Sequence, residues 1–213
     1  MSESDLAAIL CSRLCHDLVS PVGAMSNGIE MLLEDDDDDA EMRHEALKLV
    51  EMSAAQASNR LQFFRLAFGA AGGMIRTIPI AEAEKAASGL FDGEKLKLQW
   101  ESTGGEFSKP AIRLLLNMIL VATETLIRGG TVSVSMDRSG GETTFAVRAE
   151  GQGARIRAEI SATVEAPVTV ADLEPRTAPA YLARTLAESL GGRLSLRIGG
   201  NDRIALMTTV RAG

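Results

Sequence analysis

Two long helix-periodic stretches, separated by five consecutive aspartates, limit most strongly what this chain can fold into. In the first stretch, apolar residues recur at steps of three and four, which is the period of an α-helix. We therefore expect one helix over residues 4–34, with Ser4 as its N-cap. Its apolar stripe consists of Leu6, Ile9, Leu10, Leu14, Leu18, Val22, Met25, Ile29 and Leu32.

The second stretch predicts a helix over residues 40–68 that runs back along the first. The run from Asp35 to Asp39 carries charges so dense that they repel each other and stay solvated, so these residues are expected to form the loop. Two long helices joined by a short loop make an antiparallel hairpin. The expected inner face of the second helix contains Met42, Leu47, Val50, Ala54, Ala57, Leu61, Phe64 and Phe68.

A hairpin of this kind buries only one seam of each helix and leaves apolar surface uncovered. Pairing with a second copy covers that surface and gives a four-helix bundle. The sequence therefore predicts a homodimer.

The pattern changes after the small, flexible segment from Gly69 to Gly73, which marks a domain boundary. We place one domain at 1–72 and the other at 73–213. In the second, strands and apolar helices predict an α/β layer with helices covering one face of a sheet. The expected strands are 74–78, 96–102, 131–137, 143–149, 193–198 and 204–210; the expected helices are 80–91, 110–127 (opened by Ser108 as N-cap) and 178–190.

Composition excludes several classes of function. A net charge of -7 argues against nucleic acid as the main partner. No apolar run reaches the roughly 20 residues that cross a bilayer, and the first ten residues lack the basic start of a secretory signal. Cys11 and Cys15 lack a matching second pair of ligands, so we expect reduced, partly buried thiols, no bound metal and a cytoplasmic protein.

The first helix carries the most distinctive segment, Leu-Cys-His-Asp-Leu-Val-Ser-Pro-Val at positions 14–22. At about 100° per residue, His16 falls opposite the middle of the apolar stripe and should face water. Pro21 cannot donate to the carbonyl of Asp17, so a kink is expected one turn beyond His16. A neutral imidazole is a nucleophile near pH 7, which suits phosphohistidine chemistry. His44 lies among charged residues and is expected to be an ordinary surface residue.

The segment from His16 to Val22 resembles the H-box of sensor histidine kinases, which carries their phosphorylated histidine. Their architecture, a dimerisation hairpin followed by an α/β ATPase domain, also matches the predicted organisation. Three further segments are similar to their N-box, their first Gly box and the turn after their second Gly box. These segments are 114–122, 149–153 and 186–194.

The nucleotide-binding residues of those kinases are missing at the matching positions. Val121 stands where the N-box supplies an Asn ligand to magnesium, although hard magnesium requires oxygen ligands. Ala149 stands where an Asp binds adenine. Thr177 and Pro179 replace glycines of the lid over the phosphates, and neither has the backbone freedom of glycine.

A chain that keeps the histidine helix without the nucleotide site resembles the ChpT-type histidine phosphotransferases of alphaproteobacteria. The resemblance implies that His16 accepts a phosphoryl group from the receiver-domain aspartate of a hybrid histidine kinase. It implies transfer onward to receiver domains of response regulators, among them a cell-cycle transcription regulator and a single-domain regulator. No ATP binding is expected, because the nucleotide-binding residues are missing. No cofactor is expected either, because the magnesium belongs to the partner receiver domain.

Three neighbours of His16 are candidate supporting residues. Asp17 can orient the imidazole or hold its developing charge, or be only a flanking solvated carboxylate. Ser20, one turn after His16, and Arg13, one turn before, can approach a phosphoryl oxygen or be plain surface residues.

The partner-binding surface is expected to surround the histidine and to include Leu18 and Val19. Two other functions stay open at this point. One is a divergent ATP-dependent sensor histidine kinase, and the other is a pseudokinase adaptor that binds partners without carrying phosphate.

Overall fold

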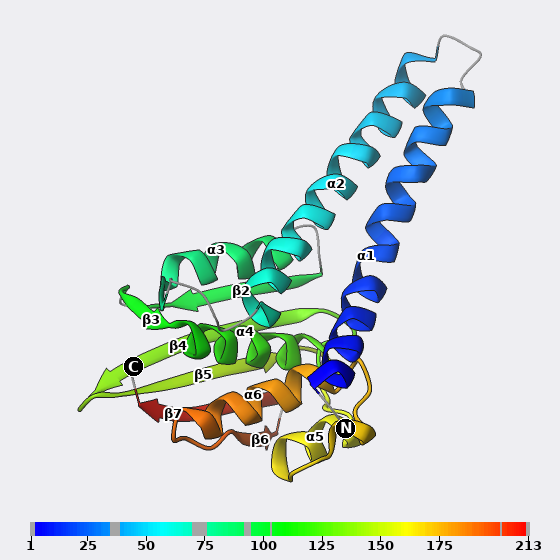
Figure 1. The fold of residues 1–213 in the computed structure, drawn as a ribbon. Coiled ribbons are helices and arrows are strands. Elements are labelled where there is room, and N and C mark those ends of the chain that lie inside the picture. The colour runs from blue at the N-terminus through cyan, green and yellow to red at the C-terminus, as the bar shows by residue number, and fades with distance from the viewer. Residues whose placement is uncertain are drawn as a thin grey trace.

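The first part of the fold is a long antiparallel helical hairpin that projects from the rest of the molecule (Figure 1). The structure, a computed structural model, describes residues 3–34, 39–69, 76–91, 95–102, 104–200 and 202–211. The hairpin consists of α1 (Glu3–Glu34) and α2 (Ala40–Phe68). The predicted hairpin is therefore present, with α2 bounded as expected. Ser4 lies inside α1, so its prediction as the N-cap is wrong.

The aspartate run has a structural role at its last residue. The carboxylate of Asp39 accepts hydrogen bonds from the backbone N–H groups of Glu41 and Met42 and caps α2. A carboxylate at this position satisfies free N–H groups and interacts favourably with the helix dipole. The expectation of a loop at Asp35 to Asp38 lies outside the described residues.

The seam between the two helices is built from small residues. On α2 the buried positions are Ala46, Ser53 and Ala57, and Gly28 is buried on α1. The seam is so close that a Cβ on Gly28 would lie 2.7 Å from Cγ2 of Val50. Part of the predicted inner face of α2 was therefore wrong, because close contact of backbones requires small side chains. The residues that remain exposed include Met42, Leu47, Ala54 and Leu61.

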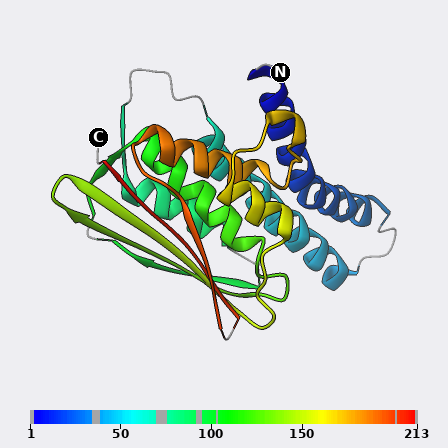
Figure 2. The same cartoon turned by 90° about the horizontal axis from the view of Figure 1, so that it is seen from below.

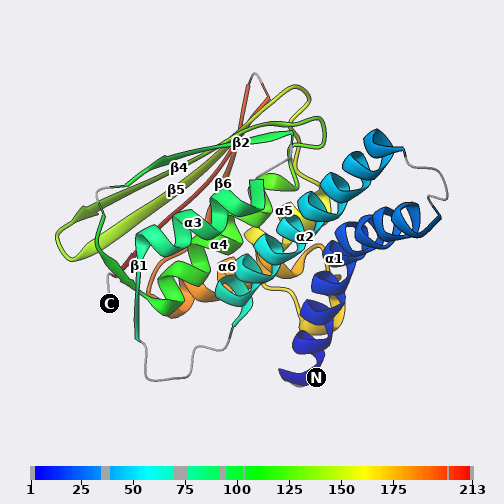
Figure 3. The same ribbon diagram turned by 90° about the horizontal axis from the view of Figure 1, so that it is seen from above.

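The first helix changes direction partway along its length (Figure 3). It contains Pro21, which removes one backbone donor from the helix interior. The bend agrees with the kink that the sequence predicts. It directs the N-terminal half of α1 towards the second part of the molecule (Figures 1 and 3).

The second part is a five-stranded sheet with its helices on one face (Figure 2). The strand order is β2-β4-β5-β7-β6, with β2 parallel to β4 and the other pairs antiparallel. β1 and β3 form a separate antiparallel pair. The strands are β1 (Thr77–Pro79), β2 (Leu96–Glu101), β3 (Glu106–Ser108), β4 (Gly130–Ser139), β5 (Glu142–Glu150), β6 (Ser195–Gly199) and β7 (Arg203–Arg211). The helices are α3 (Ile80–Phe91), α4 (Lys109–Thr123), α5 (Ala158–Glu165), the 3-10 helix η1 (Val170–Asp172) and α6 (Ala178–Ser189).

Most predicted elements are present, and the differences have local causes. α4 ends at Thr123 rather than at residue 127: the backbone N–H of Thr125 bonds to the carbonyl of Ala122, three residues back, and its hydroxyl bonds to the same carbonyl. Ser108 is the N-cap as predicted, but its side chain makes no capping bond. The strand expected at 74–78 begins only at Thr77 among the described residues. The sequence patterns missed β3 and α5, which are short.

The hairpin is joined to the sheet layer through the C-terminal end of α2 and the central helix α4. Phe63 and Phe64 of α2 are buried, with ring planes nearly perpendicular at 86°. The side-chain nitrogen of Asn117 donates to the backbone carbonyls of Ala67 (3.0 Å) and Arg113 (2.8 Å). The predicted boundary between residues 72 and 73 lies outside the described residues.

Candidate phosphotransfer site

His16 lies on the N-terminal half of α1 with 78% of its side chain exposed, as its position opposite the apolar stripe predicted. Its Nδ1 is 3.0 Å from Oδ1 of Asp17. Because a carboxylate only accepts hydrogen bonds, this contact places a proton on Nδ1. Nε2 then carries the lone pair, and it has no hydrogen-bond partner among the described residues.

Asp17 is held from two sides. Only 13% of its side chain is exposed, and its second oxygen, Oδ2, accepts from Nε of Arg13 at 2.8 Å. Its backbone carbonyl accepts from Nη1 of Arg60 on α2 at 3.4 Å. Asp17 is therefore a fixed carboxylate rather than a freely solvated one.

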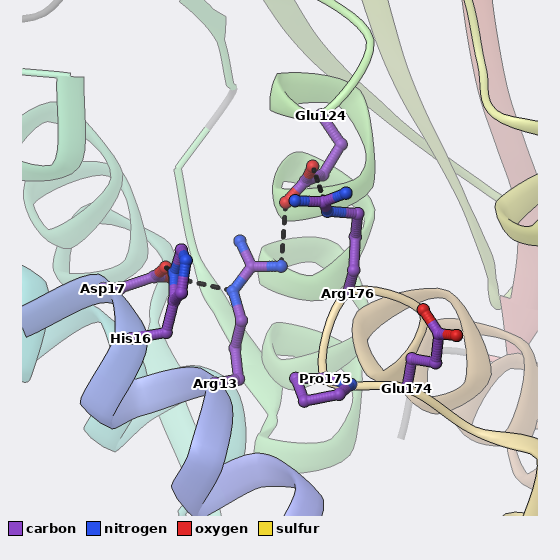
Figure 4. Close-up of a pocket in the computed structure, with 7 residues that line it drawn as sticks. All are labelled: Arg13, His16, Asp17, Glu124, Glu174, Pro175 and Arg176. Carbon is purple, nitrogen blue, oxygen red and sulfur yellow. Dashed lines mark hydrogen bonds and ion pairs between the residues drawn. The ribbon is translucent and has the colours of Figure 1, made fainter.

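Arg13 connects the histidine helix to the second part of the molecule (Figure 4). Its Nη1 lies 2.8 Å from Oε1 of Glu124, directly after α4, and Nε of Arg176 lies 3.7 Å from the other oxygen of Glu124. Burial disfavours the charged guanidinium, but Glu124 and Asp17 outweigh it and raise the pKa of Arg13 above its ordinary value. Arg13 is thus a buried bridge rather than an exposed phosphate ligand in this conformation.

A cavity of about 270 Å³ opens between the two parts of the molecule beside His16. Figure 4 shows its lining side chains converging from α1, from the end of α4 and from the loop before α6. Sequence reasoning placed Arg13, His16 and Asp17 near each other but missed the other four. The lining residues are Arg13, His16, Asp17, Glu124, Glu174, Pro175 and Arg176.

The other predicted neighbours of His16 lie on the surface or at its edge. Ser20 is exposed one turn beyond His16, without a recorded contact among the described residues. Val19 is 70% exposed and Leu18 is half-buried, so both remain candidates for a docking surface. His44 is exposed at the far end of the hairpin, where it lines a separate hollow with Asp39.

The two thiols near the site are exposed, which corrects the expectation that they are partly buried. Both cysteines are free. The hydrogen bond and charge interaction with Cys11 raise the pKa of Cys15, with burial as a minor cause. Among the residues that the structure describes, no group of three or more His, Cys, Asp or Glu side chains is arranged to hold a metal ion.

The positions at which the sequence resemblance expects a nucleotide site hold packed side chains. Val121 and Ala149 belong to the apolar core, with 2% and 1% of their surface exposed. Pro179 is buried at the start of α6. Thr177 precedes it as the N-cap, and its hydroxyl bonds to the backbone of Glu174.

Comparison with known proteins shows which family and which structures this chain resembles. The family of histidine phosphotransferase C-terminal domains matches residues 80–202. The protein phosphotransferase ChpT of Brucella abortus is 35% identical over 207 residues, covering 95% of this chain and 94% of the relative. The 1.7 Å structure of a bacterial phosphotransferase is 33% identical, with a TM-score of 0.83 over 98% of this chain and 97% of that chain. The histidine kinase domain of a blue-light-activated kinase from Erythrobacter litoralis shares the fold, with 14% identity, a TM-score of 0.50, and coverage of 90% of this chain and 96% of that one.

The matching family and the two phosphotransferase relatives define the class of protein as a histidine phosphotransferase. Within this class, the chain belongs to the ChpT family of protein phosphotransferases. It therefore transfers phosphoryl groups by way of histidine, and its partners are components of two-component phosphorelays.

Proposed function

We propose that His16 is the phosphorylated residue and that it relays phosphoryl groups between receiver domains. The supporting observation is its geometry: the side chain is 78% exposed, and Nδ1 is bonded to Asp17 at 3.0 Å. The proton on Nδ1 leaves Nε2 as the accessible nucleophile on a solvent-facing helix. A histidine buried for structural reasons would have neither property.

The proposed reaction is an in-line displacement at phosphorus. The lone pair of Nε2 forms the P–N bond while the P–O bond to the donor aspartate breaks, and the electron pair leaves on the donor carboxylate. The imidazole gains positive charge, which the carboxylate of Asp17 stabilises through Nδ1–H. The same steps in reverse pass the phosphoryl group to the aspartate of a second receiver. The magnesium that neutralises phosphate charge is expected on the receiver.

The two histidines allow a direct test of the site. The protein is incubated with a receiver domain phosphorylated on its aspartate, and acid-labile label on the chain is measured. His16→Ala should abolish labelling, whereas His44→Ala, a control at the far end of the hairpin, should label like the wild type. Label that persists in His16→Ala would reject the assignment of the site.

Asp17 and Arg13 are proposed to act through the histidine, and Ser20 to face the phosphoryl group. Asp17 holds Nδ1, and Arg13 holds Asp17 with contacts of 2.8 Å on both sides. The Ser20 hydroxyl is exposed one helical turn from His16, where it can form a hydrogen bond to a phosphoryl oxygen or a bridging water. Leu18 and Val19 are proposed to contact the receiver, because Val19 offers an exposed apolar side chain three residues from His16.

We infer that the second domain does not bind ATP and that the chain is not an autokinase. The packed side chains of Val121, Ala149 and Pro179 support this inference, because they occupy positions where a nucleotide site requires oxygen ligands or flexible glycine. Isothermal titration calorimetry with magnesium-ATP should show no saturable heat. Saturable binding would restore the alternative of a divergent histidine kinase.

The specific partners follow from the family resemblance and remain proposals. The proposed donor is the receiver domain of a hybrid histidine kinase, and the acceptors are receiver domains of response regulators. Measuring transfer to and from a panel of receivers would identify them. A reconstituted relay that keeps full activity with His16→Ala would instead favour the pseudokinase adaptor.

A cytoplasmic homodimer is proposed from the surface of the hairpin. Contrary to the expectation from the sequence, α1 is long and apolar enough over Ser4–Leu33 to cross a membrane by length and composition, with only 11% of its most apolar window buried. The same helix packs along α2 and carries the paired charges of Arg13 and Asp17. A second copy, rather than a bilayer, is therefore the proposed cover for its exposed apolar side chains.

A further inference from the structure

A series of ion pairs links the sheet layer to α1, the helix that carries His16. Glu124, directly after α4, holds Nη1 of Arg13 at 2.8 Å, and Arg13 holds Asp17 through Nε at 2.8 Å. The side chains are well shielded from water, with exposures of 19% for Glu124, 11% for Arg13 and 13% for Asp17. Ion pairs with this degree of burial are screened far less by solvent than surface pairs.

The contact at the end of this series, between Asp17 and His16, is the one that bears on the chemistry. Asp17 uses one oxygen for Arg13 and the other for Nδ1 of His16. The plane of a carboxylate that is held at both oxygens is fixed, and so is the direction of the bond to the imidazole. The orientation of the histidine therefore depends on where Arg13 is held.

The position of Arg13 in turn depends on its contact with Glu124 in the second domain. Its guanidinium is shared between two carboxylates, Asp17 and Glu124, each at 2.8 Å. Without Glu124, the buried positive charge of Arg13 would have only Asp17 to neutralise it, and the guanidinium would compete with His16 for both oxygens of that carboxylate. Glu124 thus keeps one Asp17 oxygen available to the imidazole.

We propose that Glu124 is a positioning residue for phosphotransfer: it holds Arg13 so that Asp17 fixes the Nδ1–H form of His16 and leaves Nε2 free to react. This inference rests on the proposed role of His16. It gives the second domain a function in the reaction that requires no nucleotide. Figure 4 shows Arg13 between Asp17 and Glu124, with a dashed line to each.

Other charged groups also face this site, and the test must separate them from Glu124. Arg60 contacts the backbone of Asp17 from α2, while Glu174 and Arg176 line the cavity from the loop before α6. Arg176 reaches Glu124 at 3.7 Å and is about half exposed, so its contact is weaker. Neither Glu174 nor Arg176 bonds to the imidazole in the part of the chain that the structure describes.

The tautomer of His16 gives a readout that is independent of activity. The chain has only two histidines, so labelling with ¹⁵N-histidine gives two sets of ring signals, and His44 is an internal reference. At about pH 8, above the usual titration range of imidazole, the ¹⁵N shifts report which nitrogen carries the proton. The wild type should show His16 mainly as the Nδ1–H form.

Glu124→Gln should move a substantial fraction of His16 to the Nε2–H form and slow transfer from a phosphorylated receiver by about tenfold. The matched control is Glu82→Gln, which removes another contact between hairpin and sheet layer, the 3.7 Å pair of Glu82 with Arg65; neither residue lines the cavity beside His16. Glu82→Gln should change neither the tautomer nor the rate. Glu124→Asp, which keeps the charge, should lie between Glu124→Gln and the wild type and provides a milder variant if Glu124→Gln fails to fold.

A double-mutant cycle separates positioning from simple docking of the domains. In the background of Arg13→Met, Glu124→Gln should have no further effect on the tautomer, because its only proposed route to His16 is gone. An unchanged tautomer in folded Glu124→Gln would overturn the proposal, and so would a slower rate without a tautomer change. Because the tautomer is measured without a receiver, failure of His16 as the labelled residue would be seen separately, in the labelling experiment.

Discussion

At the scale of single residues, Asn117 shows how a side chain of the degenerate N-box is used. It is completely buried, and its amide nitrogen donates to carbonyls of two different helices, at Ala67 of α2 and Arg113 of α4. Each satisfied hydrogen bond of a buried donor contributes roughly 1 kcal/mol to stability. This amide therefore stabilises the junction between hairpin and sheet layer.

Asn117→Ala should lower the free energy of unfolding by about 2–3 kcal/mol, because two hydrogen bonds of roughly 1 kcal/mol each are lost and a small cavity forms. Urea unfolding followed by circular dichroism measures the change. Asn27→Ala, at an exposed position of α1, is the control and should change stability by less than about 0.5 kcal/mol. Equal stability of Asn117→Ala and wild type would show that the amide bonds do not hold the junction.

The cysteine pair before His16 gives a prediction on pH dependence. A hydrogen bond and a charge interaction with Cys11 raise the pKa of Cys15, so less of its reactive thiolate is present at a given pH. Cys11→Ala removes both causes and should shift the pH profile of Cys15 alkylation to lower pH. The measurement is the rate of iodoacetamide labelling of Cys15 by peptide mass spectrometry. A profile that stays in place or shifts to higher pH would contradict the assigned cause.

The residue scale also marks the limit of what the sequence could predict. His16 and Asp17 are adjacent, and Arg13 is one helical turn away, so helix periodicity alone placed them together. Glu124 and Arg176 reach the same cavity only because the sheet layer packs beside α1. No local pattern encodes that packing, so the far side of the site could not be predicted.

At the scale of elements, Gly28 marks a close approach of α1 to α2. A Cβ at Gly28 would lie 2.7 Å from a methyl of Val50 and 3.1 Å from the carbonyl of Ala46, whereas a Cβ at Gly23 would meet nothing within 4 Å. Replacing glycine by alanine should therefore have opposite effects on stability at these two positions of α1. Periodicity predicted both helices well but not this close seam, because apolarity does not report how near two backbones approach.

Gly28→Ala should destabilise the protein by about 1–3 kcal/mol, because the hairpin must open to admit the methyl group. Gly23→Ala should instead stabilise it by up to about 1 kcal/mol through helix propensity. Thermal unfolding of the two variants beside the wild type tests both signs at once. A stabilising Gly28→Ala would mean that the seam is looser than the structure shows.

At the scale of the whole molecule, the exposed apolar surface of the hairpin supports the proposed homodimer. Exposed apolar residues follow a seven-residue spacing on both helices, at Val22 and Ile29 of α1 and at Leu47 and Leu61 of α2, with Ala54 midway between the last two. That spacing is typical of a seam between packed helices. In the proposed dimer, two copies of the hairpin would cover these residues and supply four helices around one core.

Ile29→Glu should therefore convert a dimer into a monomer, because a carboxylate buried in the seam has no partner and a twofold interface contains it twice. Sedimentation equilibrium at micromolar concentration measures the mass. Ile198→Glu is the matched control: Ile198 is also an exposed isoleucine, at 68%, but lies on β6 away from the hairpin, and the variant should stay dimeric. Wild type that sediments as a monomer at this concentration would refute the dimer, and a dimeric Ile29→Glu would place the interface on another surface.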